Sequence, residues 1–330
     1  MRVIDAHSHF LADAVLDVLR GGQYPHARAE ERDDGQTWVV CTKGLQFPVT
    51  PLFTDIDAKL AWMDQNRIDV SLTSTCAPLF LYELPADELD SLCRQVNDSA
   101  ATLREGSGGR LIGMATVPIT DPELAAQELR RARRDLDLRG VEIGTSVGDM
   151  MLDDASLDVF YSTAEELEAT IFLHPYIYML GLRTVPGFER FFLLNNVGNT
   201  LETHVAAARM MLGGVFDRHP GLKVQLSHGG GGLAYQLARL NHTYALREQI
   251  REVAKRPPFE YLHHFLFDTV VYDPRPLQFL VDLAGPENVV FGTDHPFDIA
   301  DVGGIASSEA MGEAVAARVL ESNAAAAYGI

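Results

Sequence analysis

Cysteine is scarce in this chain, and long hydrophobic runs are missing. Cys41, Cys76 and Cys93 are the only cysteines in 330 residues, and their spacing fits neither a disulfide framework nor a zinc-binding motif. No apolar stretch is long enough to span a bilayer, and no basic segment followed by an apolar one opens the sequence. These absences argue against disulfide-stabilised and membrane proteins, and they predict a cytoplasmic location.

Positive charge is also scarce. The chain has 27 lysines and arginines against 46 aspartates and glutamates, a formal net charge of -19. Nucleic acids and anionic membranes need a basic surface, so neither is expected as a partner. A small anionic substrate remains compatible, because a metal ion and a few arginines can reverse the field locally.

A glycine-rich phosphate turn is absent after the first predicted strand, where His7 and His9 stand instead. This absence argues against an open doubly wound sheet that binds a dinucleotide. The glycines at 229–232 lack the lysine of a phosphate-binding loop, so we interpret them as a turn that passes close to substrate or metal.

The chain does have a regular alternation of short apolar strands and helices. We predict eight strands, at residues 2–6, 70–73, 111–117, 140–144, 170–174, 222–228, 266–270 and 289–294. Residues 11–54 are predicted to be an insertion with a small hairpin sheet. Helices are expected from the cap residue Thr54 onward and at 87–104, 123–134, 157–168, 202–216 and 308–328. This order predicts an α/β protein with a closed (β/α)8 barrel, as one domain over residues 1–330.

Two histidines flank Ser8 at the end of the first predicted strand. Because side chains alternate along a strand, His7 and His9 should point the same way. Neutral imidazole is a favoured ligand for zinc and similar ions, so this pair could form half of a divalent metal site. By itself such a pair is equally compatible with a structural role.

Further polar residues end three other strands. His174, His228 and Asp294 close the fifth, sixth and eighth predicted strands. Each has a simple alternative: a turn before Pro175, a cap before the glycines, or a helix cap. In a barrel, however, the carboxyl ends of all strands surround one opening, so these groups should meet His7 and His9. Three imidazoles and a carboxylate are a coordination set for zinc or manganese with one position left open.

Other candidates are less informative. His295 follows Asp294 and could line the same opening. Glu142 on the fourth strand could bridge a second metal if it faced inward, but a capping or solvent-facing role is the favoured interpretation. The remaining histidines fall away from predicted strand ends and are interpreted as structural or solvent-facing.

The chain resembles the amidohydrolase superfamily and, within it, the metal-dependent decarboxylases. The resemblance is carried by the segments Ile4-Asp5-Ala6-His7-Ser8-His9-Phe10, Phe172-Leu173-His174-Pro175, Leu226-Ser227-His228-Gly229-Gly230-Gly231 and Gly292-Thr293-Asp294-His295-Pro296-Phe297, and by Arg239 and Arg247. It spans nearly the whole chain with similar spacing.

The resemblance implies a function for each of these residues. It implies one divalent metal, usually zinc, held by His7, His9, His174 and Asp294, with His228 as a catalytic acid or base acting on a metal-bound water. It also implies a homodimer in which Arg247 reaches the substrate carboxylate in the neighbouring subunit. Arg247 could instead be a charge on a helix surface.

One position departs from the family pattern. Those decarboxylases can carry a substrate-binding arginine just before a Pro-Val pair, and Phe47 occupies that place here, before Pro48 and Val49. A ring cannot replace the bidentate carboxylate binding of a guanidinium. We therefore expect a less charged aromatic or enolic acid, stacked on Phe47.

These observations predict a non-oxidative carboxy-lyase in which His228 and Asp294 carry protons. The same metal and acid–base groups would also suit hydrolysis or hydration of a lactone, an amide or a conjugated acid. A non-catalytic barrel that binds a metabolite is a further alternative, and it predicts that the purified protein contains no metal.

Overall fold

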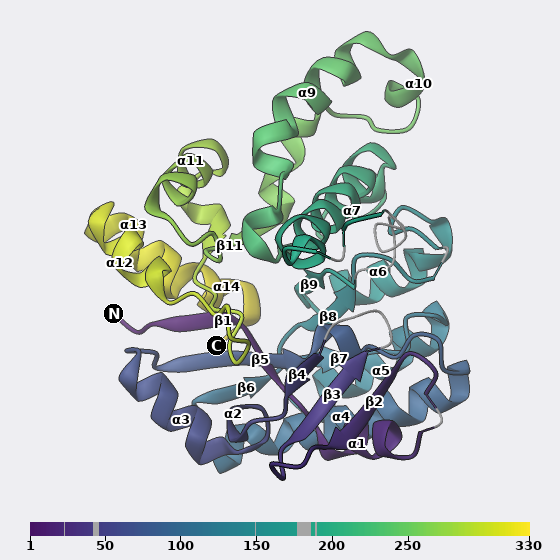
Figure 1. Cartoon of the computed structure of the whole chain (residues 1–330). Helices are drawn as coiled ribbons and strands as arrows, with labels where there is room; N and C mark the ends of the chain where they lie inside the picture. Colours follow the sequence, from purple (N-terminus) through teal and green to yellow (C-terminus); the bar gives the residue numbers. More distant parts are fainter. Residues whose placement is uncertain (23, 42–45, 149, 177–185, 189) are drawn as a thin grey trace.

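The predicted strands form a closed parallel barrel in the computed structural model, which describes residues 1–330 except 23, 42–45, 149, 177–185 and 189 (Figure 1). The eight positions around the barrel are held in order by β1 (Ile4–Phe10), β5 (Val70–Thr75), β6 (Leu111–Gly113) continued by β7 (Ala115–Thr116), β8 (Val141–Gly144), β9 (Ile171–His174), β10 (Val224–Leu226), β11 (Phe265–Asp268) and β12 (Val289–Val290). All neighbouring pairs are parallel. The predicted (β/α)8 architecture is therefore confirmed.

Two sets of backbone hydrogen bonds close the barrel between the three-stranded and six-stranded sheets. Met114 N donates to Thr73 O at 2.9 Å, and Ala6 N donates to Phe291 O at 2.8 Å. Both distances are normal for backbone hydrogen bonds. The chain beyond β12 continues along β1, because Asp294 N donates to the carbonyl oxygen of His7 at 2.8 Å. This bond places Asp294 directly beside the two histidines of β1.

An apolar plug fills the barrel where its strands begin. Its members form one cluster of buried side chains from the strands and from the last helix. They are Ile4, Ala6, Val70, Leu72, Ile112, Met114, Phe172, Leu266, Val290, Ala324 and Tyr328. The Tyr328 hydroxyl donates to Gln225 Oε1 at 2.6 Å, so the buried phenol is satisfied. Burying apolar surface at this end leaves the polar residues to gather where the strands end.

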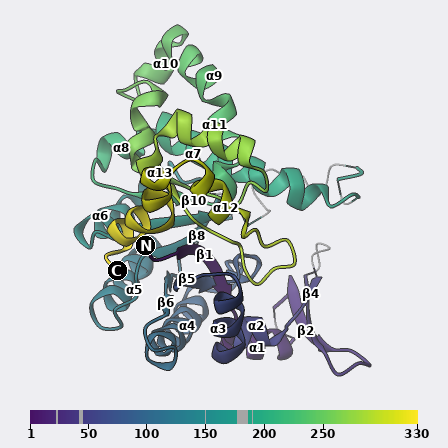
Figure 2. The same cartoon turned by 90° about the vertical axis from the view of Figure 1, so that its left-hand side faces the viewer.

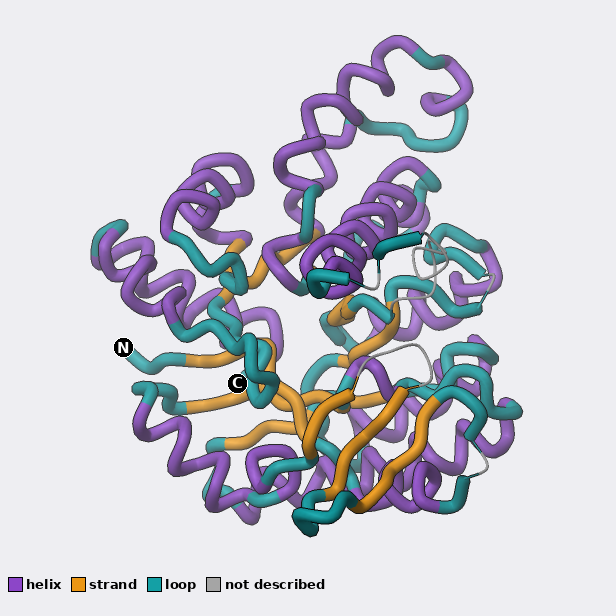
Figure 3. The backbone as a smooth tube through the Cα atoms, in the orientation of Figure 1, coloured by secondary structure: helices purple, strands orange, loops and turns teal. Residues whose placement is uncertain are grey.

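Helices surround the barrel (Figures 1 and 3). They are α1 (Asp13–Arg20), α2 (Pro51–Thr54), α3 (Ile56–Gln65), α4 (Ala86–Gly106), α5 (Pro122–Arg134), α6 (Asp158–Glu166), α7 (Thr200–Leu212), α8 (Val215–Arg218), α9 (Leu233–Leu246), α10 (Glu248–Arg251), α11 (Pro274–Ala284), α12 (Gly303–Ala310), α13 (Glu313–Ala317) and α14 (Asn323–Tyr328). Among the described residues, none of them combines the length and the apolar character that crossing a bilayer requires.

Three predicted helices differ from the structure. The helix predicted over 202–216 divides into α7 and α8 at Gly213 and Gly214. Asp55, not Thr54, caps α3, since its carboxylate accepts from Ala58 N at 2.8 Å. The continuous helix predicted over 308–328 is broken at Gly312, whose φ of +103° no helix can accommodate. A π-helical stretch, Arg318–Ser322, then leads into α14.

The insertion forms a three-stranded antiparallel sheet, in the order β2 (Ala27–Glu31), β3 (Thr37–Cys41) and β4 (Gln46–Pro48). The predicted hairpin corresponds to β3 and β4, and Leu45 at its edge lies outside the described residues. Strand β2 was not predicted, because this partly exposed edge strand is rich in charge.

The pair α9 and α10 extends away from the barrel (Figures 1 and 2). Large apolar side chains on and near it are exposed, among them Tyr235 at 81% and Leu246 at 62%. Arg247 lies at the junction of the two helices and is also exposed.

Candidate metal centre

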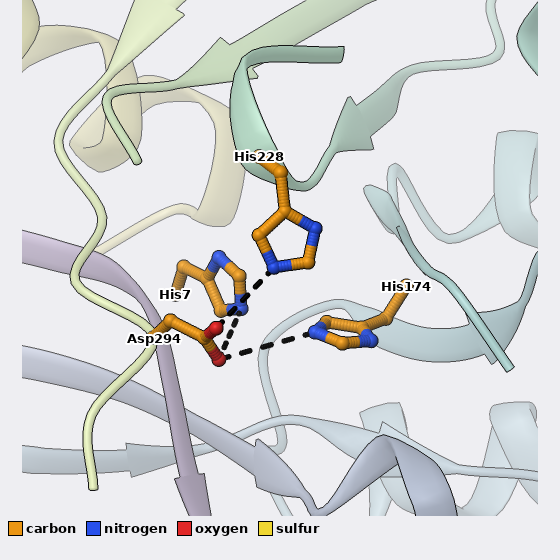
Figure 4. Close-up of side chains that lie close together, drawn as sticks. All are labelled: His7, His174, His228 and Asp294. Atoms are coloured by element: carbon orange, nitrogen blue, oxygen red, sulfur yellow. Dashed lines mark hydrogen bonds and ion pairs between the residues drawn. The ribbon is translucent and has the colours of Figure 1, made fainter. Parts of the chain in front are cut away.

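Five polar side chains meet where the barrel strands end. His7 and His9 come from β1, His174 ends β9, His228 follows β10, and Asp294 follows β12 (Figure 4). The rings of His7 and His9 have centroids 5.1 Å apart, and each lies 5.2 Å from the ring of His174. Residues separated by almost 290 positions in sequence are thus brought to one point, as the strand-end argument predicts.

Asp294 is the centre of this cluster. Its Oδ1 lies 3.1 Å from His9 Nε2, 3.3 Å from His7 Nε2 and 4.0 Å from His174 Nε2. Its other oxygen, Oδ2, lies 3.3 Å from His228 Nε2. One carboxylate oxygen therefore faces three imidazoles and the second faces the fourth imidazole (Figure 4 shows all but His9).

The far sides of three rings are fixed by hydrogen bonds. His9 Nδ1 donates to Thr75 O at 2.9 Å and His174 Nδ1 donates to Pro175 O at 3.1 Å. His7 Nδ1 lies 2.6 Å from Asp268 Oδ2. Because carbonyl oxygens only accept, the bonds of His9 and His174 place the proton on Nδ1 and aim the Nε2 lone pair at the centre, the arrangement usual for metal-binding histidines.

The donor set fits a divalent cation. The Nε2 atoms of His7 and His174 are buried and make no hydrogen bond among the described residues. One ligand atom from each of His7, His174, His228 and Asp294 lies within 4.8 Å of the others. Unpaired buried nitrogens beside a carboxylate are costly unless an ion or a proton satisfies them.

Burial and charge act in opposite directions on the ionisation of the cluster. Burial would raise the pKa of Asp294, but the charge on His7 and the hydrogen bonds from His228 and His9 hold that pKa well below its usual value. Burial lowers the pKa of His9, and burial together with the neighbouring histidines lowers the pKa of His174 well below 6.5. Ionised Asp294 and neutral His9 and His174 are the states that bind metal.

His228 differs from the other histidines because it faces a cavity. It has a left-handed backbone (φ 54°) on the turn His228–Gly230, and its backbone N–H donates to Asp268 Oδ2 at 3.0 Å. Asp294 also has a positive φ, of 62°. Such conformations cost energy in non-glycine residues and concentrate at functional sites.

The cavity beside His228 has a volume of about 660 Å³. Its lining residues come from four segments and are Asn195, Asn196, Asn199, Thr200, His228, Val270, Val271, Tyr272, Asp298, Ile299 and Ala300. No lysine or arginine is among the described residues of this lining. A volume of this size suits a small organic molecule.

The glycines after His228 serve packing as well as turning. A Cβ at Gly231, which has φ +61°, would lie 1.9 Å from the carbonyl oxygen of Thr200, and one at Gly230 would lie 2.7 Å from the ring of Phe267. Their small size therefore lets neighbouring backbone, rather than substrate alone, approach the turn closely.

The sequence analysis missed two buried residues that support the centre. Asp268 ends β11 and holds His7 and the turn of His228, so its position at a strand end was a usable signal. Lys59 of α3 donates to His9 O at 2.6 Å and to Ser8 Oγ at 2.7 Å, and lies 3.4 Å from His295 Nδ1. No local pattern marks Lys59, because its partners lie about fifty residues or more away.

His295 and Glu142 are both buried near the cluster. The ring of His295 stacks on Trp62 of α3 with centroids 3.6 Å apart, and the carbonyl oxygen of His295 accepts from His9 N at 2.7 Å. The favoured interpretation of Glu142 is wrong: it is fully buried, with Oε1 3.9 Å from His9 Nδ1. Burial raises the pKa of Glu142 well above its usual value, because the charged form of this carboxyl is poorly solvated there.

The two predicted substrate contacts lie outside the centre itself. Phe47 is buried, and its ring centroid lies 5.4 Å from that of Phe297. The ring centroid of Phe297 in turn lies 5.5 Å from that of His9. Phe47 is thus one ring removed from the cluster. Arg247 does not line the cavity of its own chain.

Barrel and cluster together define a class. The chain belongs to the amidohydrolase family, whose model matches residues 4–330. It is 35% identical over 250 residues to 2-amino-3-carboxymuconate-6-semialdehyde decarboxylase of Dictyostelium discoideum. The matched region covers 75% of this chain and 68% of that enzyme. The solved 5-carboxyvanillate decarboxylase of Sphingomonas paucimobilis is similar over 100% of this chain and 99% of that one, with a TM-score of 0.84 and 26% identity.

A second solved structure, at 23% identity, shows the same fold. This is a dihydroxybenzoic acid decarboxylase of Polaromonas sp. JS666 with bound manganese and the inhibitor 2-nitroresorcinol, with a TM-score of 0.81 over 99% of this chain and 97% of that one.

Proposed function

We propose that this protein is a metal-dependent, non-oxidative decarboxylase of an aromatic or enolic carboxylic acid. The observation that carries the proposal is the position of His228, which contacts Asp294 within the cluster and also lines the cavity. The similar proteins described above are named decarboxylases, in line with this assignment.

One divalent ion would be held by His7, His9, His174 and Asp294. Zinc is the first expectation for three imidazoles and a carboxylate, and manganese, present in one similar structure, is the second. Such an ion supplies a Lewis acid and a template for the substrate carboxylate and an adjacent oxygen. Asp268 and Lys59 would keep the donors on β1 in place.

The proton chemistry falls to His228 and Asp294. Replacing a carboxylate by hydrogen consumes one proton: it adds to the carbon that bears the carboxylate, the bond to that carboxylate then breaks, and its electron pair restores the double bond. His228, which lines the cavity, would deliver this proton. Asp294, 3.3 Å away, would hold the imidazole in position.

The surroundings of the site suggest what else takes part. Phe297, which packs against His9, would provide an aromatic wall for a planar acid, and Phe47 would support it from behind. We further propose a cytoplasmic homodimer in which Arg247 enters the site of the neighbouring subunit, since Arg247 is exposed on a helical arm with unpaired apolar side chains.

His228→Ala tests this assignment, with the exposed His263→Ala as a matched control. We expect His228→Ala to retain bound metal and to release CO2 at least 100-fold more slowly from a panel of aromatic and enolic acids, because a general acid contributes about 10²–10⁴ in rate. His263→Ala should keep both properties. Full activity of His228→Ala would reject its role, and loss of metal would make it a ligand instead.

The same panel separates the proposal from hydrolysis or hydration. A decarboxylase releases one CO2 for each molecule of acid consumed, and a hydrolase or hydratase gives a product that has gained water with its carboxylate retained.

A further inference from the structure

One wall of the cavity is built by the segment that leads into α7. Residues Leu194–Asn199 form a π-helical stretch, a rare conformation that often occurs at functional sites. Asn199 ends this stretch and lines the cavity together with His228. Unlike Asn196, which is exposed, Asn199 is only 8% exposed.

Contacts on two sides hold this segment in place. The carbonyl oxygen of Asn199 accepts from Thr203 Oγ1 at 3.2 Å, and that hydroxyl lies 3.5 Å from Ser227 Oγ at the end of β10. On the other side, Gly231 packs against Thr200 so closely that any Cβ would meet its carbonyl oxygen at 1.9 Å. The position of Asn199 is thus coupled to the turn that carries His228.

The backbone carbonyl oxygen of Asn199 has a hydrogen-bond donor, but its side-chain oxygen has none among the described residues. Its Oδ1 is buried and accepts no hydrogen bond among the described residues. A buried amide oxygen without a donor costs free energy, and native structures keep such groups rarely. Because this residue lines a cavity, a bound molecule is the natural source of the missing donor.

The charge around the cavity restricts that molecule. The described lining residues include no lysine or arginine, and Asp298 is an acid on the wall that follows β12. A second carboxylate on the substrate would find no cationic partner there within this chain. A hydroxyl or an amine, in contrast, can donate to the amide oxygen without any charge.

We propose that Asn199 is a specificity-determining residue that accepts a hydrogen bond from an uncharged hydroxyl or amine on the substrate acid. This inference rests on the proposed decarboxylase function. A site built to bind a donor discriminates against the analogue that lacks it, because the amide oxygen is then left unpaired.

The test compares wild type, Asn199→Leu and Asn199→Asp, each loaded with manganese. Calorimetry measures the binding of benzoate and of 2-, 3- and 4-hydroxybenzoate. We expect wild type to bind at least one hydroxybenzoate more tightly than benzoate. Asn199→Leu should reduce that preference about tenfold, with benzoate affinity unchanged, because one hydrogen bond is lost. Asn199→Asp keeps an acceptor, so it should retain the preference while binding every acid more weakly.

The ratio of affinities separates recognition from general damage. An unchanged preference in Asn199→Leu, or an equal loss for benzoate and the hydroxybenzoates, would overturn the proposal. So would a lower melting temperature of Asn199→Leu with an unchanged ratio, since removing an unpaired buried amide should not destabilise the fold. If no acid releases CO2 but the ratio still depends on Asn199, the decarboxylase proposal fails and the recognition role stands.

Discussion

The substitution Asp268→Asn is the sharpest test of whether Asp268 orients His7 and the turn of His228. The carboxylate has no solvent exposure, and its Oδ2 lies 2.6 Å from His7 Nδ1 and 3.0 Å from the backbone N of His228. Its Oδ1 accepts from Gly229 N at 2.8 Å. Asparagine has nearly the same shape but only one oxygen, so one of its two polar atoms becomes a donor that faces a donor.

The size of the effect follows from those contacts. Losing the partner that orients a metal-binding histidine typically costs 10–100-fold in metal affinity, or about 1.4–2.7 kcal/mol. A buried N–H left without an acceptor adds about 1–3 kcal/mol of destabilisation. We therefore expect Asp268→Asn to bind Zn²⁺ 10–100-fold more weakly and to unfold at lower urea concentration even without metal.

Competition with a chromophoric chelator measures the first effect and urea unfolding of the metal-free protein measures the second. Asp282→Asn is the matched control, because Asp282 is exposed and contacts only the side chain of Gln278 in the described structure. Metal affinity within twofold of wild type in Asp268→Asn would refute the view that Asp268 orients His7.

Three further predictions concern other parts of the molecule. Gly231→Ala should lower the free energy of unfolding by more than about 2 kcal/mol in urea titrations, because φ is +61° and the new Cβ would meet Thr200 O at 1.9 Å; wild-type stability would contradict this. Burial lowers the pKa of His264 to about 4, so the stability that neutral His264 contributes is complete above pH 6.5 and is lost as the pH falls toward 4. His264→Gln should remove up to about 3 kcal/mol of this pH dependence of the unfolding free energy. Identical pH profiles of the two proteins would argue against this prediction. If Arg247 acts in the neighbouring subunit, mixing inactive Arg247→Ala and His228→Ala proteins should restore decarboxylation, whereas a mixture that stays inactive would place both residues in one chain's site.

The meeting of these side chains at one end of the barrel was predictable because strand ends follow simple rules. His7 and His9 share a face by the two-residue period of a strand, and His174, His228 and Asp294 each follow a recognisable apolar run. Parallel strands in a closed barrel bring all of these ends together, so no knowledge of loops is needed. The same reasoning should have included Asp268.

Other features depend on contacts that no local pattern records. Glu142 lies on a strand whose four residues are all buried, so no alternation marks which side faces inward. Lys59 is a charged residue on a surface helix, and its burial is decided by distant partners on β1. The break at Gly312 was hidden in an alanine-rich run, where helix propensity outweighs one glycine in any local estimate.

The most direct test of the central claim is decarboxylation in D2O, followed by mass spectrometry of both products from the metal-loaded protein. The account predicts one CO2 per molecule of acid, one deuterium at the carbon that carried the carboxylate, and no reaction after a chelator removes the metal. A product that has gained the elements of water and kept its carboxylate, or CO2 release that survives metal removal, would contradict it.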